Sequence, residues 1–258
     1  DASALKRFDP SLLRTLFQVS GDNPLVGFEG RAALIGRLGD ALIAQAARDG
    51  LAPRPGSLYD RLTDAGARRE VSATELFAEL LRSFAPIWRA GPLLVGEPAG
   101  DCWPHRWAGA ETGSGLHPIS AGWVPFHKLT QWLAYSLIEP FEWAGVTVTG
   151  LDALTALPEY RNGGLLIDTG VIVPRSPADP ARPWKPGDEL VGEGRALTGT
   201  LIDELAPRIR ARFGASAADM PLARILEGGT WAAGRQIAAE KRLGGAPPIT
   251  VESDGTVF

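Results

Sequence analysis

The stretch Pro125-Phe-His-Lys-Leu-Thr-Gln-Trp-Leu-Ala-Tyr-Ser-Leu-Ile-Glu139 decides the fold class, because its apolar residues recur at helical spacing. One stripe of this segment is apolar and consists of Phe126, Leu129, Leu133 and Leu137. A different face carries polar side chains, namely Lys128, Gln131 and Tyr135. The pattern predicts a helix that packs its apolar stripe on a core and presents polar groups elsewhere.

Helical spacing extends along much of the chain. The further segments in which we expect helices are 9–17, 31–48, 72–84, 151–157, 195–213 and 230–242. Ser72-Ala-Thr-Glu75 has the form of a capping box, which marks a helix start. Two short apolar runs, Leu165–Ile167 and Val171–Val173, predict a small β-hairpin. The sequence therefore predicts a mainly α (α+β) fold, with residues 1–258 as a single mainly helical domain that carries a small hairpin or sheet.

The composition excludes several classes of protein. Lys and Arg number 26 against 30 Asp and Glu, a formal charge of −4 without a basic stripe, which argues against nucleic-acid binding. No apolar run approaches the ~20 residues of a membrane span, and the single cysteine, Cys102, excludes an internal disulfide. We therefore expect a cytoplasmic protein that binds neither membrane nor nucleic acid. The spacing of His105, His117 and His127 fits no metal site, so we expect no metal or other cofactor.

A long segment rich in Gly and Pro, residues 91–124, precedes the helix quoted above. A loop of this length inside a compact chain is usually functional or disordered. This one carries tryptophans together with Asp101 and His105, which favours a functional loop. Asp101 and Trp103 are therefore candidate site residues.

Pro158-Glu-Tyr-Arg-Asn-Gly-Gly164 is the densest polar cluster of the chain. Glu159 offers a base, Tyr160 a hydroxyl and Arg161 a fork for anions, while the two glycines permit close approach of the backbone. The alternative is a tight turn held by a salt bridge between Glu159 and Arg161.

Two further charged residues adjoin predicted helix starts. Lys128 lies in the first turn of its helix, where the helix dipole disfavours a cation. Together with free backbone N–H groups it would make an anion site, and the alternative is a solvated surface lysine. Glu227 precedes Gly228-Gly229 and the start of a helix, either as a site carboxylate or as a helix cap.

Asp168-Thr-Gly170 has the signature of aspartic proteases. That chemistry needs two carboxylates that share a proton in an all-β frame. This chain has one copy of the tripeptide, in helical surroundings. We therefore interpret Asp168 as a hairpin-turn residue without a carboxylate partner.

Many of these segments resemble one protein family. The matching segments are Gln18–Ser20, Asn23–Gly27, Gly30–Ala33, Phe126–Leu133, Tyr135–Pro140, Leu157–Gly164, Arg195–Thr198, Glu227–Arg235 and Ser253–Phe258. Together they resemble the uracil-catabolism family of fungi and bacteria, long known only as a domain of unknown function. The resemblance covers almost the whole chain, which looks like the C-terminal portion of a longer family protein. It departs from the family at Gly194, where we expect a tryptophan.

A second resemblance is to queuosine-salvage glycosidases, helical proteins with a DNA-glycosylase-like fold. Their Tyr-Lys-x-x-Gln helix corresponds here to His127-Lys-Leu-Thr-Gln131, and their Asp-Tyr-Arg loop corresponds to Glu159-Tyr-Arg161. The resemblance implies that Glu159 stands where that family has its catalytic aspartate, with a side chain one methylene longer.

The two resemblances imply an N-glycoside hydrolase of uracil (pyrimidine) degradation, which cleaves a ribosylurea-type ribosyl phosphate to urea and ribose phosphate. The implied catalytic residues are Glu159, Lys128 and His127. Glu159 would stabilise an oxocarbenium-like state and activate water, and the proton donor to urea would be His127, Asp101 or Glu227. The implied substrate-binding residues are Tyr160, Arg161, Asn162, Gln131, Asp101, Trp103 and Glu227. Two alternatives stay open: a ureido amidohydrolase, and a non-catalytic nucleotide-binding or scaffold subunit of the same route.

Overall fold

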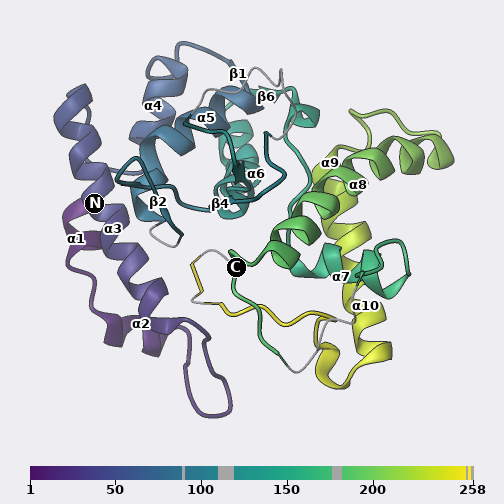
Figure 1. The fold of residues 1–258 in the computed structure, drawn as a ribbon. Helices are drawn as coiled ribbons and strands as arrows, with labels where there is room; N and C mark the ends of the chain where they lie inside the picture. The colour runs from purple at the N-terminus through teal and green to yellow at the C-terminus, as the bar shows by residue number, and fades with distance from the viewer. Residues whose placement is uncertain (89–90, 110–118, 176–181, 254, 257–258) are drawn as a thin grey trace. The chain divides into compact units, whose positions relative to one another are not determined.

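The computed structural model describes residues 1–88, 91–109, 119–175, 182–253 and 255–256. The chain forms two compact units (Figure 1). The first comprises Asp1–Asp101, Ser136–Thr149 and Ser253–Phe258, and the second comprises Cys102–Tyr135 and Gly150–Glu252. Every site residue predicted from the sequence belongs to the second unit, except Asp101.

The first unit contains most of the helices predicted for the N-terminal third of the chain. They are α1 (Ala2–Lys6), α2 (Pro10–Leu16), α3 (Phe28–Asp49), α4 (Ser57–Thr63), α5 (Ala73–Phe84) and the 3-10 helix η1 (Ala85–Ile87). The predicted helices at 9–17, 31–48 and 72–84 are confirmed. Ser72 caps α5 as expected, because its hydroxyl accepts a hydrogen bond from the backbone N–H of Glu75 (3.1 Å).

Short strands complete the first unit. β1 (Glu70–Ser72) pairs in parallel with β6 (Thr147–Thr149), and β2 (Leu93–Leu94) pairs antiparallel with β3 (Glu97–Pro98). The core lies beneath β1 and α5, where Val71, Leu76 and Leu80 are fully buried. In the described part of the chain, no helix is long and apolar enough to cross a membrane.

In the second unit, β4 (Cys102–Pro104) pairs antiparallel with β5 (Trp123–Pro125) and leads into α6 (Lys128–Trp143), whose second half belongs to the first unit. The predicted helix therefore exists. It begins at Lys128 instead of Pro125 because Trp123–Pro125 is used by the strand.

The expected hairpin at 165–173 is wrong. Its first run is part of helix α7 (Tyr160–Asp168), and the predicted helix at 151–157 is a single 3-10 turn, η2 (Leu151–Ala153). Glu159 caps α7, and the backbone N–H groups of Val171 and Ile172 both return to the carbonyl of Leu166 as the chain leaves the helix. The apolar run at 165–167 suits a strand or a helix equally. The cap at its start and the hydrogen bonds to the Leu166 carbonyl at its end make it a helix.

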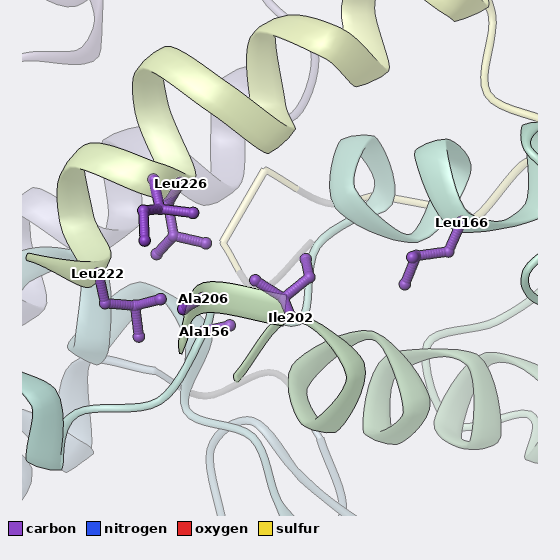
Figure 2. Close-up of a cluster of buried hydrophobic side chains, with 7 residues drawn as sticks. Ala156, Leu166, Ile202, Ala206, Leu222 and Leu226 are labelled. Carbon is purple, nitrogen blue, oxygen red and sulfur yellow. The ribbon is translucent and has the colours of Figure 1, made fainter. Parts of the chain in front are cut away.

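The remaining helices form the core of the second unit. They are α8 (Glu189–Phe213), α9 (Leu222–Ile225), the π-helical turn η3 (Leu226–Trp231), α10 (Ala232–Lys241) and the 3-10 turn η4 (Leu243–Gly245). Figure 2 shows the buried cluster to which α7, α8, α9 and η3 contribute. The mainly α fold class is confirmed, and the sheets of the described residues are small two-stranded ones.

Candidate active site

Glu159 fixes the start of α7. Its carboxylate accepts hydrogen bonds from the backbone N–H groups of Arg161 (2.8 Å) and Asn162 (2.6 Å), which the first turn of a helix leaves without intrahelical partners. The residue is only 6% exposed. Because an N–H group holds each of its two oxygens, the buried carboxylate has one fixed orientation.

The pKa of Glu159 is raised above that of an ordinary glutamate. Burial is the largest cause, because it disfavours the charged form, and the two backbone hydrogen bonds oppose it. The positive charges of Lys128 and Arg161 also lower the pKa, but by less than burial raises it. A carboxyl group perturbed in this way by burial and by specific charges is a candidate for proton transfer.

Lys128 is the first residue of α6 and is 5% exposed. The alternative of a solvated surface lysine is therefore wrong. Burial and a helix N-terminus both disfavour a cation, so an ammonium group held here requires negative charge nearby. Glu159 supplies such a charge, because Lys128 acts electrostatically on its carboxyl group. Two of the predicted catalytic residues thus lie within electrostatic range of each other.

His127, which precedes Lys128, has a φ of +44°, in the left-handed region that residues other than glycine rarely adopt. Its carbonyl accepts a hydrogen bond from the backbone N–H of Gln131 (3.0 Å) and so closes the first turn of α6. Backbone strain of this kind persists only where the surroundings hold it, and it clusters at functional sites.

Arg161 and Asn162 carry buried polar atoms that have no hydrogen-bond partner among the described residues. Arg161 Nη1 donates to the carbonyl of Gly245 (2.7 Å), while its Nε has no acceptor. Asn162 Nδ2 donates to the carbonyl of Leu157 (3.3 Å), while its Oδ1 has no donor. Buried polar atoms are nearly always paired, so these two atoms are suited to polar groups of a ligand. Glu159 and Arg161 take separate partners, in place of the salt bridge considered as the alternative.

Gln131 and Tyr135, two members of the polar face of α6, hold the chain ahead of Glu159. Gln131 is buried, and its Nε2 donates to the carbonyl of Thr155 and to the Thr155 hydroxyl (3.1 Å). The hydroxyl of Tyr135 donates to the same carbonyl (3.2 Å). In this structure both side chains therefore bind the protein backbone.

The glycines of the predicted cluster permit close packing of helices. Both lie inside α7. A Cβ on Gly163 would lie 2.9 Å from Thr198 Oγ1 of α8, and one on Gly164 would lie 3.2 Å from Pro248. The close backbone approach expected from this pair is thus made to neighbouring parts of the same unit.

Of the other candidate residues, Tyr160 begins α7, whereas Trp103, Glu227 and Asp101 lie elsewhere in the chain. Trp103, on β4, packs against Gly187, where a Cβ would lie 2.6 Å from the indole ring. Glu227 is exposed on η3, and Tyr160 is 40% exposed with the Arg161 guanidinium 4.9 Å from its ring centroid. Asp101 is buried but belongs to the first unit.

Arg195 adjoins both motifs of the site, a role that the sequence analysis missed. It lies on α8 and is 4% exposed. Its Nε donates to the carbonyl of Pro158 (3.1 Å), and its Cζ lies 4.1 Å from the ring centroid of Phe126. The signal that could have found it is helical spacing, because Arg195 shares the buried face of α8 with Thr198, Ile202 and Ala206.

His105 is almost buried on the loop after β4. Its Nδ1 accepts from the backbone N–H of Trp107 (3.3 Å), and its Nε2 lies 3.9 Å from Glu193 Oε1. Within the described ranges, no three His, Cys, Asp or Glu side chains gather as metal ligands. His117 lies outside those ranges.

Asp168 ends α7 and is paired with an arginine. Both guanidinium ends of Arg242 donate to its carboxylate, Nη1 at 2.8 Å from Oδ1, and its side chain is 5% exposed. The interpretation as a hairpin-turn residue is therefore wrong. An aspartate held by an arginine also differs from the proton-sharing carboxylates of an aspartic protease.

The fold and the site define a mainly helical protein in which a buried glutamate caps one helix within electrostatic range of a buried lysine on another. The chain belongs to the family described as a protein of unknown function (DUF1688), whose model matches residues 1–258. The family expected from the sequence motifs is thus confirmed.

Two relatives illustrate the family. The chain is 39% identical over 265 residues to "Uracil catabolism protein 4" of Lachancea kluyveri, in a match that covers 94% of this chain and 59% of that protein. It is 37% identical over 262 residues to "Protein urg3" of Schizosaccharomyces pombe, in a match that covers 100% of this chain and 61% of that protein. The chain thus spans about three fifths of the length of both relatives.

Proposed function

We propose that this chain carries the catalytic site of an N-glycoside hydrolase of uracil degradation, which cleaves a ribosylurea-type ribosyl phosphate to urea and ribose phosphate. The name of one relative supports the route. The observation that carries the reaction type is Glu159, a buried carboxylate of fixed orientation and raised pKa on which Lys128 acts electrostatically.

In this reaction, the bond between ribose C1 and the urea nitrogen is replaced by a bond from C1 to a water oxygen. As the C1–N bond breaks, positive charge develops on C1, and the Glu159 carboxylate stabilises it. Glu159 accepts a proton from the attacking water. The urea nitrogen keeps the electron pair of the broken bond and takes a proton. We assign the role of proton donor to His127, because Glu227 is exposed and Asp101 belongs to the first unit.

The charges around Glu159 suit an anionic substrate. Lys128 and Arg161 both act on the Glu159 carboxyl group, so a phosphate bound by them would lie near it. Asn162 Oδ1, which lacks a donor among the described residues, suits an N–H of the ureido group. A second negative charge beside Glu159 would raise its pKa further and favour its role as proton acceptor.

The test is urea release from ribosylurea 5-phosphate by the purified chain and, in parallel, by the full-length Lachancea kluyveri relative. We expect turnover by the chain and a fall of ~100-fold or more for Glu159→Gln. Glutamine keeps only one of the two oxygens that accept the backbone N–H groups of Arg161 and Asn162, so this variant should also lose about 1–3 kcal/mol of stability while it stays folded. Glu204→Gln is the matched control, because Glu204 is an exposed glutamate of α8. Its turnover should equal that of the unmodified chain.

Three results would contradict the proposal. A Glu159→Gln variant that melts early yet keeps normal turnover per folded molecule would leave Glu159 a structural residue. Tight binding of a uracil-derived nucleotide without turnover in either protein would indicate a nucleotide-binding subunit. Zinc-dependent release of ammonia would indicate a ureido amidohydrolase.

A further inference from the structure

Arg195 connects the two segments that carry Glu159 and Lys128. The carbonyl that accepts its Nε–H belongs to Pro158, the residue before Glu159. The ring under its guanidinium belongs to Phe126, two residues before Lys128. One buried side chain of α8 therefore contacts both segments at positions next to the charged residues.

Two further residues of α8 hold the rest of the segment around Glu159. One helical turn after Arg195, Thr198 Oγ1 would lie 2.9 Å from a Cβ at Gly163, and about two turns after Arg195, Asp203 Oδ1 accepts a hydrogen bond from the backbone N–H of Ala156 (2.7 Å). Residues 156–163 are thus attached to α8 at three points, of which the contact of Arg195 is adjacent to Glu159.

The chemistry of these contacts requires an arginine. A guanidinium is planar, so it can donate from Nε in its plane while its face lies on an aromatic ring. A lysine ammonium in the same place keeps the charge but has no Nε–H at this position of the side chain and no planar face. The contact with the Pro158 carbonyl fixes the peptide group that leads into the extended backbone of Glu159.

We infer that Arg195 is a positioning residue, which holds the Glu159 carboxylate and the Lys128 segment in register for the reaction; this rests on the function proposed above. Arg195 acts through Pro158 and Phe126 rather than on the substrate. Misplacement of a reacting group by about 1 Å costs on the order of 100-fold in rate, so a side chain that sets this geometry controls kcat more than KM.

The kinetic test compares Arg195→Lys and Phe126→Leu with the unmodified chain. We expect kcat for urea release to fall ~10- to 100-fold in Arg195→Lys and by less in Phe126→Leu, while KM changes less than ~3-fold. A KM that rises at unchanged kcat would show that Arg195 binds the substrate directly, and would overturn the inference.

The second readout needs no turnover. The Glu159 carboxylate accepts hydrogen bonds from the backbone N–H groups of Arg161 and Asn162, so the exchange rates of these two amides report directly on the position of the carboxylate. We expect these two amides to exchange at least ~10-fold faster in Arg195→Lys. This loss of protection should exceed the change in the other amides of α7. Unchanged exchange at both amides would overturn the inference.

Arg210→Lys is the matched control. Arg210 also lies on α8, donates from Nε to a backbone carbonyl, that of Met220 (2.9 Å), and forms an ion pair with Asp152. It lies 15 residues along the helix, about 22 Å from Arg195. Its variant should lose stability without changing kcat or the two amides. Absence of turnover in both the unmodified chain and the full-length relative would refute the proposed function, and the exchange data would still decide the positioning role.

Discussion

Gly234 of α10 lies directly against the backbone of Arg161 in α7: a Cβ at Gly234 would be 2.4 Å from the Arg161 carbonyl oxygen. That carbonyl belongs to the first turn of the helix that Glu159 caps. The two helices can approach this closely only because position 234 has no side chain. The packing of the helix that Glu159 caps thus depends on a glycine about 70 residues further along the chain.

Replacement of this glycine should disturb α7. The new methyl group in Gly234→Ala would collide with the Arg161 carbonyl, a backbone group that cannot rotate away as a side chain can. We therefore expect the free energy of unfolding to fall by about 1–3 kcal/mol. Gly229→Ala, in the same sequence motif, is the control: nothing lies within 4 Å of a Cβ there, and helix propensity favours alanine by up to ~1 kcal/mol. Urea denaturation of both variants measures the difference, and equal stabilities would contradict the packing assigned to Gly234.

The ion pair of Asp168 and Arg242 should contribute to the stability of the fold and not to turnover. Asp168→Asn leaves Arg242 partly buried without its carboxylate, and since the arginine side chain is 26% exposed we expect a loss of about 1–3 kcal/mol. Asp152→Asn, which breaks the pair with Arg210, should cost less than ~1 kcal/mol, because the Asp152 carboxylate is 41% exposed whereas that of Asp168 is 5% exposed, and Arg210 keeps its hydrogen bond to the Met220 carbonyl. Urea release per folded molecule should stay normal in Asp168→Asn. A loss of turnover with normal folding would give Asp168 a catalytic role.

Helical spacing and capping residues predicted the main helices because those signals are local. Ser72 caps α5 through Glu75, and the α3 segment begins and ends within three residues of its expected limits. The hairpin at 165–173 failed because a short apolar run suits a strand and a buried helix equally. The cap at Glu159 decides between the two, and its side chain is recognised as a cap only once the backbone is known.

The candidate site was predictable in its residue types but not in its burial. The sequence placed Lys128 at a helix start and left open whether it is exposed, since burial depends on parts of the chain remote in sequence. Helical spacing places Arg195 on the buried face of α8, but its contacts could not be predicted for the same reason: its partners, Pro158 and Phe126, are 37 and 69 residues away. Long-range polar contacts of this kind have no periodic signal in one sequence.

Gln131 should act on stability more than on substrate affinity. Its amide donates to Thr155, so Gln131→Leu removes donors from an ordered carbonyl and should cost about 1–2 kcal/mol. KM for ribosylurea 5-phosphate should stay within ~3-fold of the unmodified value, which corresponds to less than ~0.7 kcal/mol. The substrate-binding role assigned to Gln131 from the family resemblance predicts the opposite, a raised KM in a protein of normal stability.

The raised pKa of Glu159 makes stability depend on pH with a defined sign. The folded protein binds the Glu159 proton more tightly than the unfolded chain, whose glutamate keeps its ordinary value of 4.5. Glu159 therefore stabilises the fold at pH below that value, and this contribution is lost as pH rises through the folded-state pKa. The free energy of unfolding of the unmodified chain, minus that of Glu159→Gln, should fall as pH rises from about 4 to 7. A difference that rises with pH would mean a lowered pKa.

The charge of Lys128 should affect the pH dependence of activity. In the proposed reaction the Glu159 carboxylate acts in its ionised form, so the acid limb of kcat/KM should lie above the ordinary glutamate value of 4.5, because burial raises the pKa of Glu159. Lys128 opposes that shift. Lys128→Met removes the opposing charge at similar side-chain length, so the midpoint of the acid limb should move to higher pH while residual activity falls. Arg48→Met, at an exposed arginine of the first unit, should leave the limb in place. If the acid limb stays at the same pH in Lys128→Met, Lys128 does not act electrostatically on the Glu159 carboxylate, and its assignment to the site is wrong.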